Sequence, residues 1–320
     1  MDLNQAKEAF ELLLHSVRPG ATRQFIAWLE DRIEDEQLMM EKEWSRQDKI
    51  LDSIREDIRG KLPLTAMSDT ETIHIPQYKN LNPKTTVHVD AFLYDDDFVE
   101  RLCEEGKMSR NVCTQCGSHD TQPLTLLTHS ASITQIKYIF LHVLPSLQGR
   151  KFVDIGSRTG AILYGAYLYS ACSQIIGVEM DISFCHLQQH IVSSYNFQDR
   201  IKIVHDDVLN QLNMIKNCDV LVLNNVFEFF LTSEQQVHVW KQLFTVLRKP
   251  GTLLVTVPSI EESLEHLETG IDVMKWLRPV DLSDKLEEAR ILLKKTDDAD
   301  ELDKIYLYQV AARSQNKKEL

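Results

Sequence analysis

The sequence predicts an α/β fold built on a doubly wound, mostly parallel β-sheet. In the second half of the chain, short apolar runs with the length of buried strands alternate with segments of helical periodicity. Mostly apolar strands are typical of a parallel sheet that helices cover on both faces. Polar residues gather where these runs end, and in open α/β sheets ligands bind at that edge.

The first strand of this pattern leads into a glycine turn and then a helix. Residues 151–160 read KFVDIGSRTG, in which a run carrying Asp154 breaks at Gly156, and a helix is expected over residues 161–171. This order brings backbone N–H groups at the start of a helix close to a nucleotide-like ligand. Two glycines are a weak signal by themselves, and the strands that follow strengthen it.

Further strands and helices are predicted after this turn. Strands are expected at residues 175–178, 201–204, 219–223 and 252–257, with a last strand at 304–312 beyond an acidic loop around 297–303. Helices are expected at residues 183–195 and 233–247. These elements place a ligand-binding domain at residues 134–315.

Composition limits the classes of protein that the chain fits. Its 43% of hydrophobic residues suit a folded core, and its net charge of −13 argues against non-specific nucleic-acid binding. The N-terminus lacks a basic segment followed by an apolar run, and no apolar run approaches the roughly 20 residues of a membrane span. We therefore expect no membrane association and a location in the cytoplasm or the nucleus.

Residues 1–64 form a predicted N-terminal helical region. Apolar residues recur at helical spacing over residues 3–17 and again over residues 22–58, with a Pro-Gly pair between the two runs. The favoured interpretation is an amphipathic layer that packs on the main domain, and the alternative is an arm that binds a partner. A connector with short strands is predicted to follow, over residues 65–133.

A zinc knuckle is predicted within this connector. Cys113 and Cys116 form a CxxC followed by glycine, a turn typical of zinc sites. Cys103 and His129 would complete a tetrahedral structural site, with His119 as the alternative fourth ligand. The competing interpretation is a turn that carries reduced thiols, because six cysteines in a chain of this size do not indicate a disulfide framework.

Five segments within residues 151–259 form a more specific pattern together than any of them does alone. They read VDIGSRTG, GVEMD, HDDVL, DVLVLNNVFEFF and VLRKPGTLLVTVPS. In this order they resemble the class I S-adenosylmethionine-dependent methyltransferases, and the late strand fits that family's antiparallel addition. A Rossmann dehydrogenase fits less well, because its fingerprint would read GxGxxG and only Gly156 and Gly160 are present here.

The resemblance implies S-adenosylmethionine as the cofactor and assigns residues to its parts. The turn with Asp154, Gly156, Ser157 and Gly160 would lie under the methionine part, and Asp154 would order the loop or reach the amino group. Glu179 would accept hydrogen bonds from the ribose hydroxyls, a role that suits a carboxylate because it can take two donors at once.

The resemblance extends to the adenine and the reactive methyl group. Asp207 would bind the adenine amino group with Val208 beside the ring, and Asp206 would take that role if the register differs by one residue. Asn224 and Asn225, after the fourth strand, would lie beside the methyl group.

Arg158 departs from the family pattern, which has a further glycine at this position. Its side chain would crowd the cofactor, or it would pair with a carboxylate of the cofactor or of Glu228. The third interpretation is that Arg158 points to solvent.

The acceptor is predicted from the residues after the fourth strand. Asn224-Asn225-Val226-Phe227 is similar to a segment of non-SET histone lysine methyltransferases, whereas the following VFEFF resembles small-molecule methyltransferases. Glu228 would orient or deprotonate the acceptor. We expect a methyltransferase that acts on a protein side chain, with a small-molecule acceptor and a non-catalytic scaffold as the alternatives.

Overall fold

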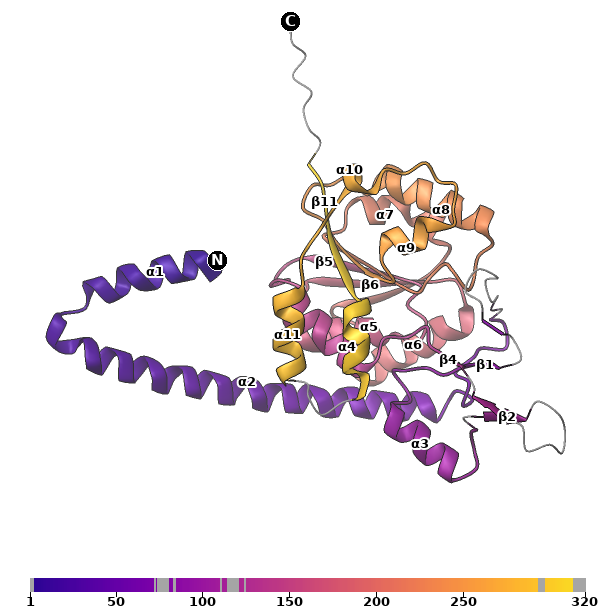
Figure 1. Ribbon diagram of the computed structural model, residues 1–320, viewed down its shortest axis with the longest axis horizontal. Helices are drawn as coiled ribbons and strands as arrows, with labels where there is room; N and C mark the ends of the chain where they lie inside the picture. The colour runs from indigo at the N-terminus through magenta and orange to yellow at the C-terminus, as the bar shows by residue number, and fades with distance from the viewer. Residues whose placement is uncertain are drawn as a thin grey trace, which may run out of the picture. The chain divides into compact units, whose positions relative to one another are not determined.

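The computed structural model describes residues 3–71, 73, 81–82, 85–109, 111–113, 121–123, 125–292 and 297–312 (Figure 1). The chain divides into two compact units, Met1–Ile50 and Leu51–Leu320. The boundary falls inside the long helix α2 (Thr22–Arg59), so the end of that helix belongs to the second unit. In the described part of the chain, no helix combines the length and the apolar character that crossing a membrane requires.

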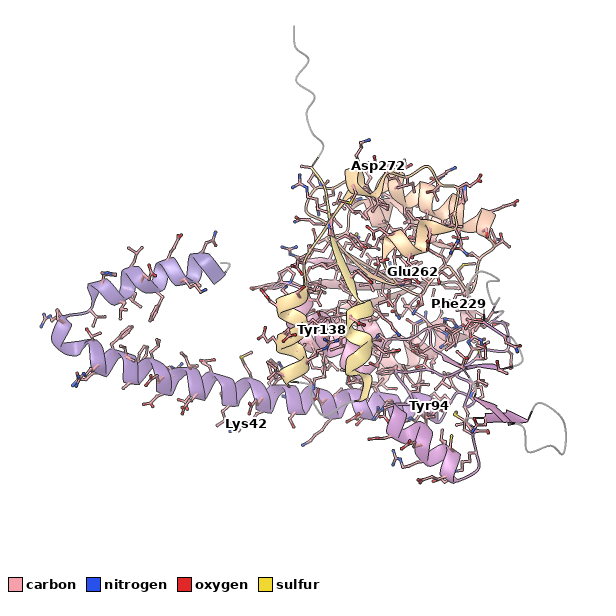
Figure 2. All side chains as sticks on the ribbon, viewed as in Figure 1. Lys42, Tyr94, Tyr138, Phe229, Glu262 and Asp272 are labelled. Atoms are coloured by element: carbon pink, nitrogen blue, oxygen red, sulfur yellow. The ribbon has the colours of Figure 1, made fainter. Side chains whose placement is uncertain are left out.

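The first unit is helical, as predicted. It consists of α1 (Leu3–Ser16), the 3₁₀ turn η1 (Pro19–Ala21) and most of α2. In the view of Figure 2, side chains project above and below the helix segment that carries Lys42. Several large apolar side chains of this unit are exposed, namely Phe10, Leu12, Leu13, Trp28, Ile33 and Met39.

The second unit contains a seven-stranded sheet with the order β10-β11-β9-β8-β5-β6-β7. Its strands are β5 (Lys151–Ile155), β6 (Gln174–Glu179), β7 (Ile201–His205), β8 (Val220–Asn224), β9 (Leu253–Val257), β10 (Leu277–Pro279) and β11 (Tyr306–Val310). Five strands run parallel, and β11 lies antiparallel to both of its neighbours. This order and this antiparallel insertion are those of the class I methyltransferase fold, so the predicted fold class is confirmed.

Helices cover both faces of the sheet (Figure 1). One face carries α7 (Leu212–Lys216), α8 (Ser233–Val246), α9 (Ile260–Glu265) and α10 (Val273–Trp276). The other face carries α4 (Ile133–Tyr138), α5 (Ala161–Tyr169), α6 (Ile182–Ser194) and α11 (Ser283–Leu292). The strands are therefore apolar on both sides, which explains why the sequence shows continuous apolar runs instead of alternation.

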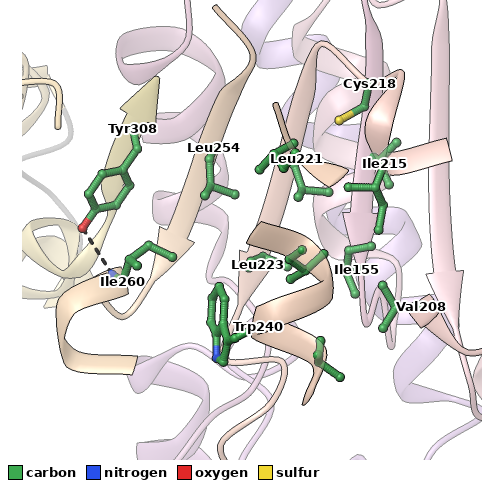
Figure 3. Packing of buried hydrophobic residues seen from close by; sticks show 14 of the residues in the cluster. Ile155, Val208, Ile215, Cys218, Leu221, Leu223, Trp240, Leu254, Ile260 and Tyr308 are labelled. Atoms are coloured by element: carbon green, nitrogen blue, oxygen red, sulfur yellow. Dashed lines mark hydrogen bonds between the residues drawn. The ribbon is translucent and has the colours of Figure 1, made fainter. Parts of the chain in front are cut away.

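The core between the sheet and α8 is closed by two large side chains with polar ends. Trp276 donates a hydrogen bond from Nε1 to the carbonyl of Leu247 at 2.9 Å. The Tyr308 hydroxyl accepts a bond from the Ile260 N–H at 3.2 Å and donates one to Glu261 (Figure 3). Because their polar atoms are satisfied, both rings can be buried in the apolar cluster without a desolvation cost.

The connector contains short elements that pack on the end of α2. They are β1 (Thr86–His88) parallel to β4 (Thr125–Leu127), β2 (Asn111–Cys113) antiparallel to β3 (Thr121–Pro123), and α3 (Asp96–Glu104). Leu51, Ile54 and Ile58 of α2 are fully buried, and Arg55 pairs with Asp95 at 2.8 Å. The Arg59 side chain donates to the Leu93 carbonyl. These contacts attach the last turns of α2 to the connector.

A few elements differ from the sequence prediction. The segment expected to be an acidic loop is the 3₁₀ helix η5 (Asp297–Lys304), and α4 continues into the π-helical turn η3 (Ile139–Val143). Strand β10 was not predicted, because three residues with the sequence LRP show no periodicity. The 3₁₀ helix η4 (Val208–Gln211) follows β7 directly.

The contact between α5 and α4 depends on a helical glycine and gives a test of the packing. A Cβ on Gly165 would overlap Ile136 Cγ2 and lie 3.1 Å from Phe140 Cε2. Alanine in a helix interior gains about 1 kcal/mol over glycine, but overpacking a core costs about 1–3 kcal/mol. We expect Gly165→Ala to lower the free energy of unfolding by up to about 2 kcal/mol in urea denaturation.

The matched control is Gly60→Ala, where the nearest atom to the new Cβ is the Asp57 carbonyl oxygen at 3.6 Å. This change should alter stability by less than about 1 kcal/mol. If Gly165→Ala instead raises the free energy of unfolding, the prediction is wrong, because α4 would then adjust to the new methyl group without a loss of stability.

Candidate functional site

A cavity of about 720 Å³ lies at the carboxyl ends of the central parallel strands. Its wall includes Ile155 of β5, Glu179 of β6, His205 of β7 and Asn224 of β8. From β5 the chain adds β6 and then β7 on one side, and it crosses back to place β8 on the other side of β5. The cavity therefore lies at the switch point of the sheet. Its volume is in the usual range of small-molecule sites.

The glycine turn between β5 and α5 can be formed only by glycine at its two ends. Gly156 has φ +69° and Gly160 has φ +85°, both in the left-handed region. A Cβ on Gly156 would overlap Val226 Cγ2, and one on Gly160 would overlap the Tyr164 ring. Gly156 lines the cavity, whereas Gly160 begins α5. The turn therefore brings bare backbone to the cavity wall.

Glu179 joins the glycine turn to the start of α6. Its carboxylate accepts the N–H of Arg158 at 2.8 Å and the N–H of Asp181 at 2.8 Å. Burial raises the pKa of Glu179, and the bonds from the backbone N–H groups oppose that rise. The residue lines the cavity, so a carboxylate held by the backbone faces the ligand space.

Asp154 and Ser157 are buried behind the turn and do not belong to the cavity wall described above. Burial, reinforced by the charge of Glu179, raises the pKa of Asp154 well above its ordinary value. The Ser157 hydroxyl donates to Gln188 at 2.8 Å, and Gln188 donates in turn to the Arg158 carbonyl at 2.8 Å. For Asp154 the position favours the loop-ordering role over contact with the amino group.

The residues after β7 also line the cavity. Asp206 accepts bonds from the N–H of Asp207 and from the side chains of Asn210 and Gln211, so both of its oxygens are used within the loop. Asp207 caps η4 through Oδ1, which accepts the N–H of Leu209 at 2.8 Å. Asp207 therefore accepts fewer hydrogen bonds from its own loop than Asp206 does.

Of the three predicted catalytic residues, two reach the cavity. Asn224 and Asn225 line it, and the Asn224 side chain donates to the His129 carbonyl at 3.1 Å. Asn225 adopts φ +50° and donates its N–H to the Val257 carbonyl at 2.7 Å. Glu228 is buried and does not line this cavity; it lines a small cavity of about 20 Å³ that Asn225 and Trp240 also line.

His129, predicted to be a zinc ligand, lines the same cavity as Asn224. Its Nε2 lies 3.1 Å from Nδ1 of His88, and its ring contacts those of Phe229 and Phe230 at centroid distances of 4.9 and 5.0 Å. Burial, with the charges of Arg158 and His88, lowers its pKa to about 3, so the ring is neutral at neutral pH. The sequence had suggested a zinc ligand at this position because of the nearby CxxC, and it gave no sign of a place in the cavity wall.

The zinc prediction itself stays a prediction. Cys103 is half-buried on α3, whereas the side chain of Cys113 and all of Cys116 and His119 lie outside the described residues. Within the residues that are described, no cluster of three or more His, Cys, Asp or Glu side chains could hold a metal ion.

Arg158 neither points to solvent nor pairs with Glu228. It is 7% exposed, and its guanidinium donates to the carboxylates of Glu71 and Asp90 and to the carbonyl of Ala66. Burial opposes the charge, but the hydrogen bonds that Arg158 donates to Glu71 and the charge of Asp90 raise its pKa above the ordinary value. The guanidinium is therefore held by the chain itself.

Two residues of the cavity wall, Thr70 and Glu71, come from the connector and were not predicted. Glu71 is 87 positions away from Arg158 in the sequence. The connector shows no periodicity or motif at this point, so the sequence carried no signal for them.

No protein-family model matches the chain, and no curated protein matches it either. Among solved structures, the chain is similar to an RNA methyltransferase from Salinibacter ruber in complex with S-adenosyl-L-homocysteine, with 14% identity, 59% of this chain and 96% of that chain covered, and a TM-score of 0.36. It is also similar to an O-methyltransferase from Bacillus cereus, with 16% identity, 58% and 84% covered, and a TM-score of 0.36. A putative methyltransferase from Escherichia coli gives 12% identity, 61% and 93% covered, and a TM-score of 0.38. Because the sequence identities and TM-scores are this low, these similarities carry no argument about function.

The raised pKa of Asp154 predicts a pH dependence of stability. An acid with a raised pKa in the fold stabilises the protein below its unfolded pKa of about 4, and this contribution is lost as pH rises through the folded pKa. Asp154→Asn removes the ionisation. The variant should therefore gain stability relative to the wild type as the pH is raised from about 4 to about 8.

Urea denaturation over this pH range, without cofactor, measures the difference between the two proteins. Glu268→Gln, at an exposed position, is the control and should follow the wild type at every pH. If the curves of Asp154→Asn and the wild type run parallel, Asp154 is not the titrating group.

Proposed function

We propose that this protein is an S-adenosylmethionine-dependent methyltransferase whose cofactor binds in the cavity at the carboxyl edge of the sheet. One observation carries the proposal. Gly156, Glu179 and Asp207, at the ends of three neighbouring strands, line a single cavity in a sheet with the class I methyltransferase order. Along the wall, backbone at Gly156 is followed by one carboxylate for the ribose hydroxyls and another for the adenine amino group. This is the spatial order in which the parts of such a cofactor are connected.

The residues fit this cofactor chemically. Gly156 has no side chain and lines the cavity, and Val226 packs where its Cβ would lie, so this part of the wall offers backbone to the ligand. Each oxygen of Glu179 already accepts one N–H and has a second lone pair for a ribose hydroxyl. Asp207, with Val208 beside it, would hold the adenine amino group and ring, and the backbone of the glycine turn would support the methionine part.

The bound cofactor would supply a methyl group on a sulfonium, which an acceptor atom attacks in line. Asn224 and His129 line the end of the cavity where we propose that the acceptor enters. Holding the acceptor close to the methyl group accounts for much of the acceleration in such reactions. The neutral His129 ring adds no positive charge that would repel the sulfonium.

We keep a protein side chain as the favoured acceptor. The exposed apolar side chains of α1 and α2 support this acceptor. Several large apolar side chains on one exposed part of a chain are typical of a surface that binds another macromolecule. A small-molecule acceptor is the second candidate, and the aromatic side chains of Phe227 and Phe230 in the cavity wall support it. A non-catalytic scaffold would bind the cofactor without turnover.

Cofactor binding is the first test. Isothermal titration with S-adenosylmethionine should give micromolar binding to the wild type, and Glu179→Ala should weaken it by roughly 10- to 100-fold because hydrogen bonds to a charged group are lost. Asp207→Asn should weaken it less, because the amide oxygen still accepts. The exposed control Glu268→Gln should bind like the wild type.

Well-folded wild-type protein that does not bind S-adenosylmethionine would contradict the proposal. A thermal melt of each variant separates loss of binding from loss of the fold.

The acceptor class is tested with methyl-labelled S-adenosylmethionine in a cell extract. Label in a protein band supports a protein side chain, and label confined to the low-mass fraction supports a small molecule.

Asn224→Ala should reduce the labelling rate by roughly 10-fold or more while cofactor binding is retained. Binding without any labelling would favour the scaffold.

A further inference from the structure

The residues around Arg158 tie the connector to the glycine turn. Its Nε donates to Glu71 Oε1 at 2.9 Å, Nη2 donates to Glu71 Oε2 at 3.0 Å and to the Ala66 carbonyl at 2.8 Å, and Nη1 donates to Asp90 at 2.8 Å. The side chains of Glu71 and Asp90 are 7% and 0% exposed. The three charges are therefore buried together and satisfy one another.

A second set of bonds attaches the same connector residues to the start of α6. The hydroxyl groups of Ser68 and Thr70 both donate to the carboxylate of Asp181, at 3.1 Å for Ser68. Asp181 also caps α6 by accepting the N–H groups of Ser183 and Phe184. Residues 66–71 are thus held to the glycine turn at their two ends, through Ala66 and Glu71, and to the start of α6 in their middle, through Ser68 and Thr70. We call them the strap.

The strap forms part of the cavity wall. Thr70 and Glu71 line the same space as Glu179, whose carboxylate binds the N–H groups of Arg158 and Asp181. Arg158 and Asp181 therefore bind the strap through their side chains and Glu179 through their backbone N–H groups. Glu179 is the residue that we propose to bind the ribose hydroxyls. We propose that the strap is part of the cofactor site, beside the ribose, and that Arg158 is a positioning residue that keeps it closed over the bound cofactor.

This inference rests on the proposed function and explains why arginine replaces glycine here. Arg158 has φ +45°, a conformation that a side chain other than glycine adopts only when its surroundings impose it. The bonds to three connector groups and the contact of the guanidinium with the Phe184 ring, 4.9 Å from its centroid, impose it. A glycine would relieve the backbone and leave the strap without its anchor.

In this proposal the closed strap retains the bound cofactor, and opening of these bonds speeds its release. Cofactor binding and strap closure should therefore stabilise each other, as linked equilibria do. Two consequences can be measured: the strap becomes protected when the site is filled, and the cofactor leaves faster when the anchor is weakened.

The first experiment is hydrogen–deuterium exchange of the full chain with and without S-adenosyl-L-homocysteine. We expect peptides that cover residues 66–71 to exchange at least about fivefold more slowly with the ligand present. Unchanged exchange in a sample shown by titration to bind the ligand would overturn the strap while leaving the cofactor site intact. If the ligand does not bind at all, both the strap and the proposed function fail.

The second experiment compares two arginine variants. Arg158→Lys keeps the positive charge and loses the fork that binds Glu71 in two places. Arg200→Lys is the matched control, because Arg200 also donates to several groups, the carbonyls of Tyr167, Ser170 and Cys172, but precedes β7 at the opposite edge of the sheet. We expect Arg158→Lys to release S-adenosyl-L-homocysteine about tenfold faster in stopped flow, and Arg200→Lys to match the wild type.

Equal release from both variants and the wild type would overturn the role of Arg158. Glu71→Gln is the additional variant in case Arg158→Lys does not fold, since it keeps the shape of the side chain and weakens only the pairing. It should also release the ligand faster than the wild type, and an unchanged rate would contradict the strap.

Discussion

A buried arginine holds together parts of this chain that the sequence separates widely. Arg158 of the glycine turn binds Glu71 and Asp90 of the connector, and Asp90 also accepts the hydroxyl of Ser130. A buried ion pair stabilises a fold only weakly, because desolvation offsets its attraction, but removing one partner leaves an uncompensated charge. The position of the connector on the sheet therefore depends on all of these groups being present together.

The acidic residues around the cavity remain compatible with one another because each is held by donors. Glu179 accepts two backbone N–H groups, and Asp206 accepts bonds from its own loop. Burial opposes the charge of Asp181, but bonds from Thr70 and from the N–H groups at the start of α6 keep its pKa below the ordinary value. Fixed donors of this kind let a cavity carry several carboxylates, and a cationic ligand would suit the result.

The acceptor end of the cavity has a different character. The His129 ring contacts the rings of both Phe229 and Phe230, and Asn224 donates to the His129 carbonyl. His129 and its aromatic neighbours form one part of the site, whereas Glu179 and Asp207 bring carboxylates to the cavity wall. The difference follows from the strand ends: β6 and β7 are followed by acids, and β8 is followed by amides and then aromatic residues.

The sequence by itself determined the sheet and its central turn. Apolar runs gave β5 to β9 and the antiparallel β11 close to their observed bounds, because strand length, helical periodicity and glycine turns are local properties. For the same reason the candidates Gly156, Glu179, Asp206, Asp207 and Asn224 lie together at one edge, since parallel strands all end there.

Only the tertiary structure decided the partners of individual side chains. The sequence left three directions open for Arg158, assigned His129 to a metal and placed Glu228 beside the acceptor, and it contained no signal for Thr70 or Glu71. Each of these depends on which distant segment is buried against which, and a local pattern does not carry that information. The strand ends could be read from the sequence because the backbone alone positions them, whereas the closure of the cavity is set by contacts across the whole second unit.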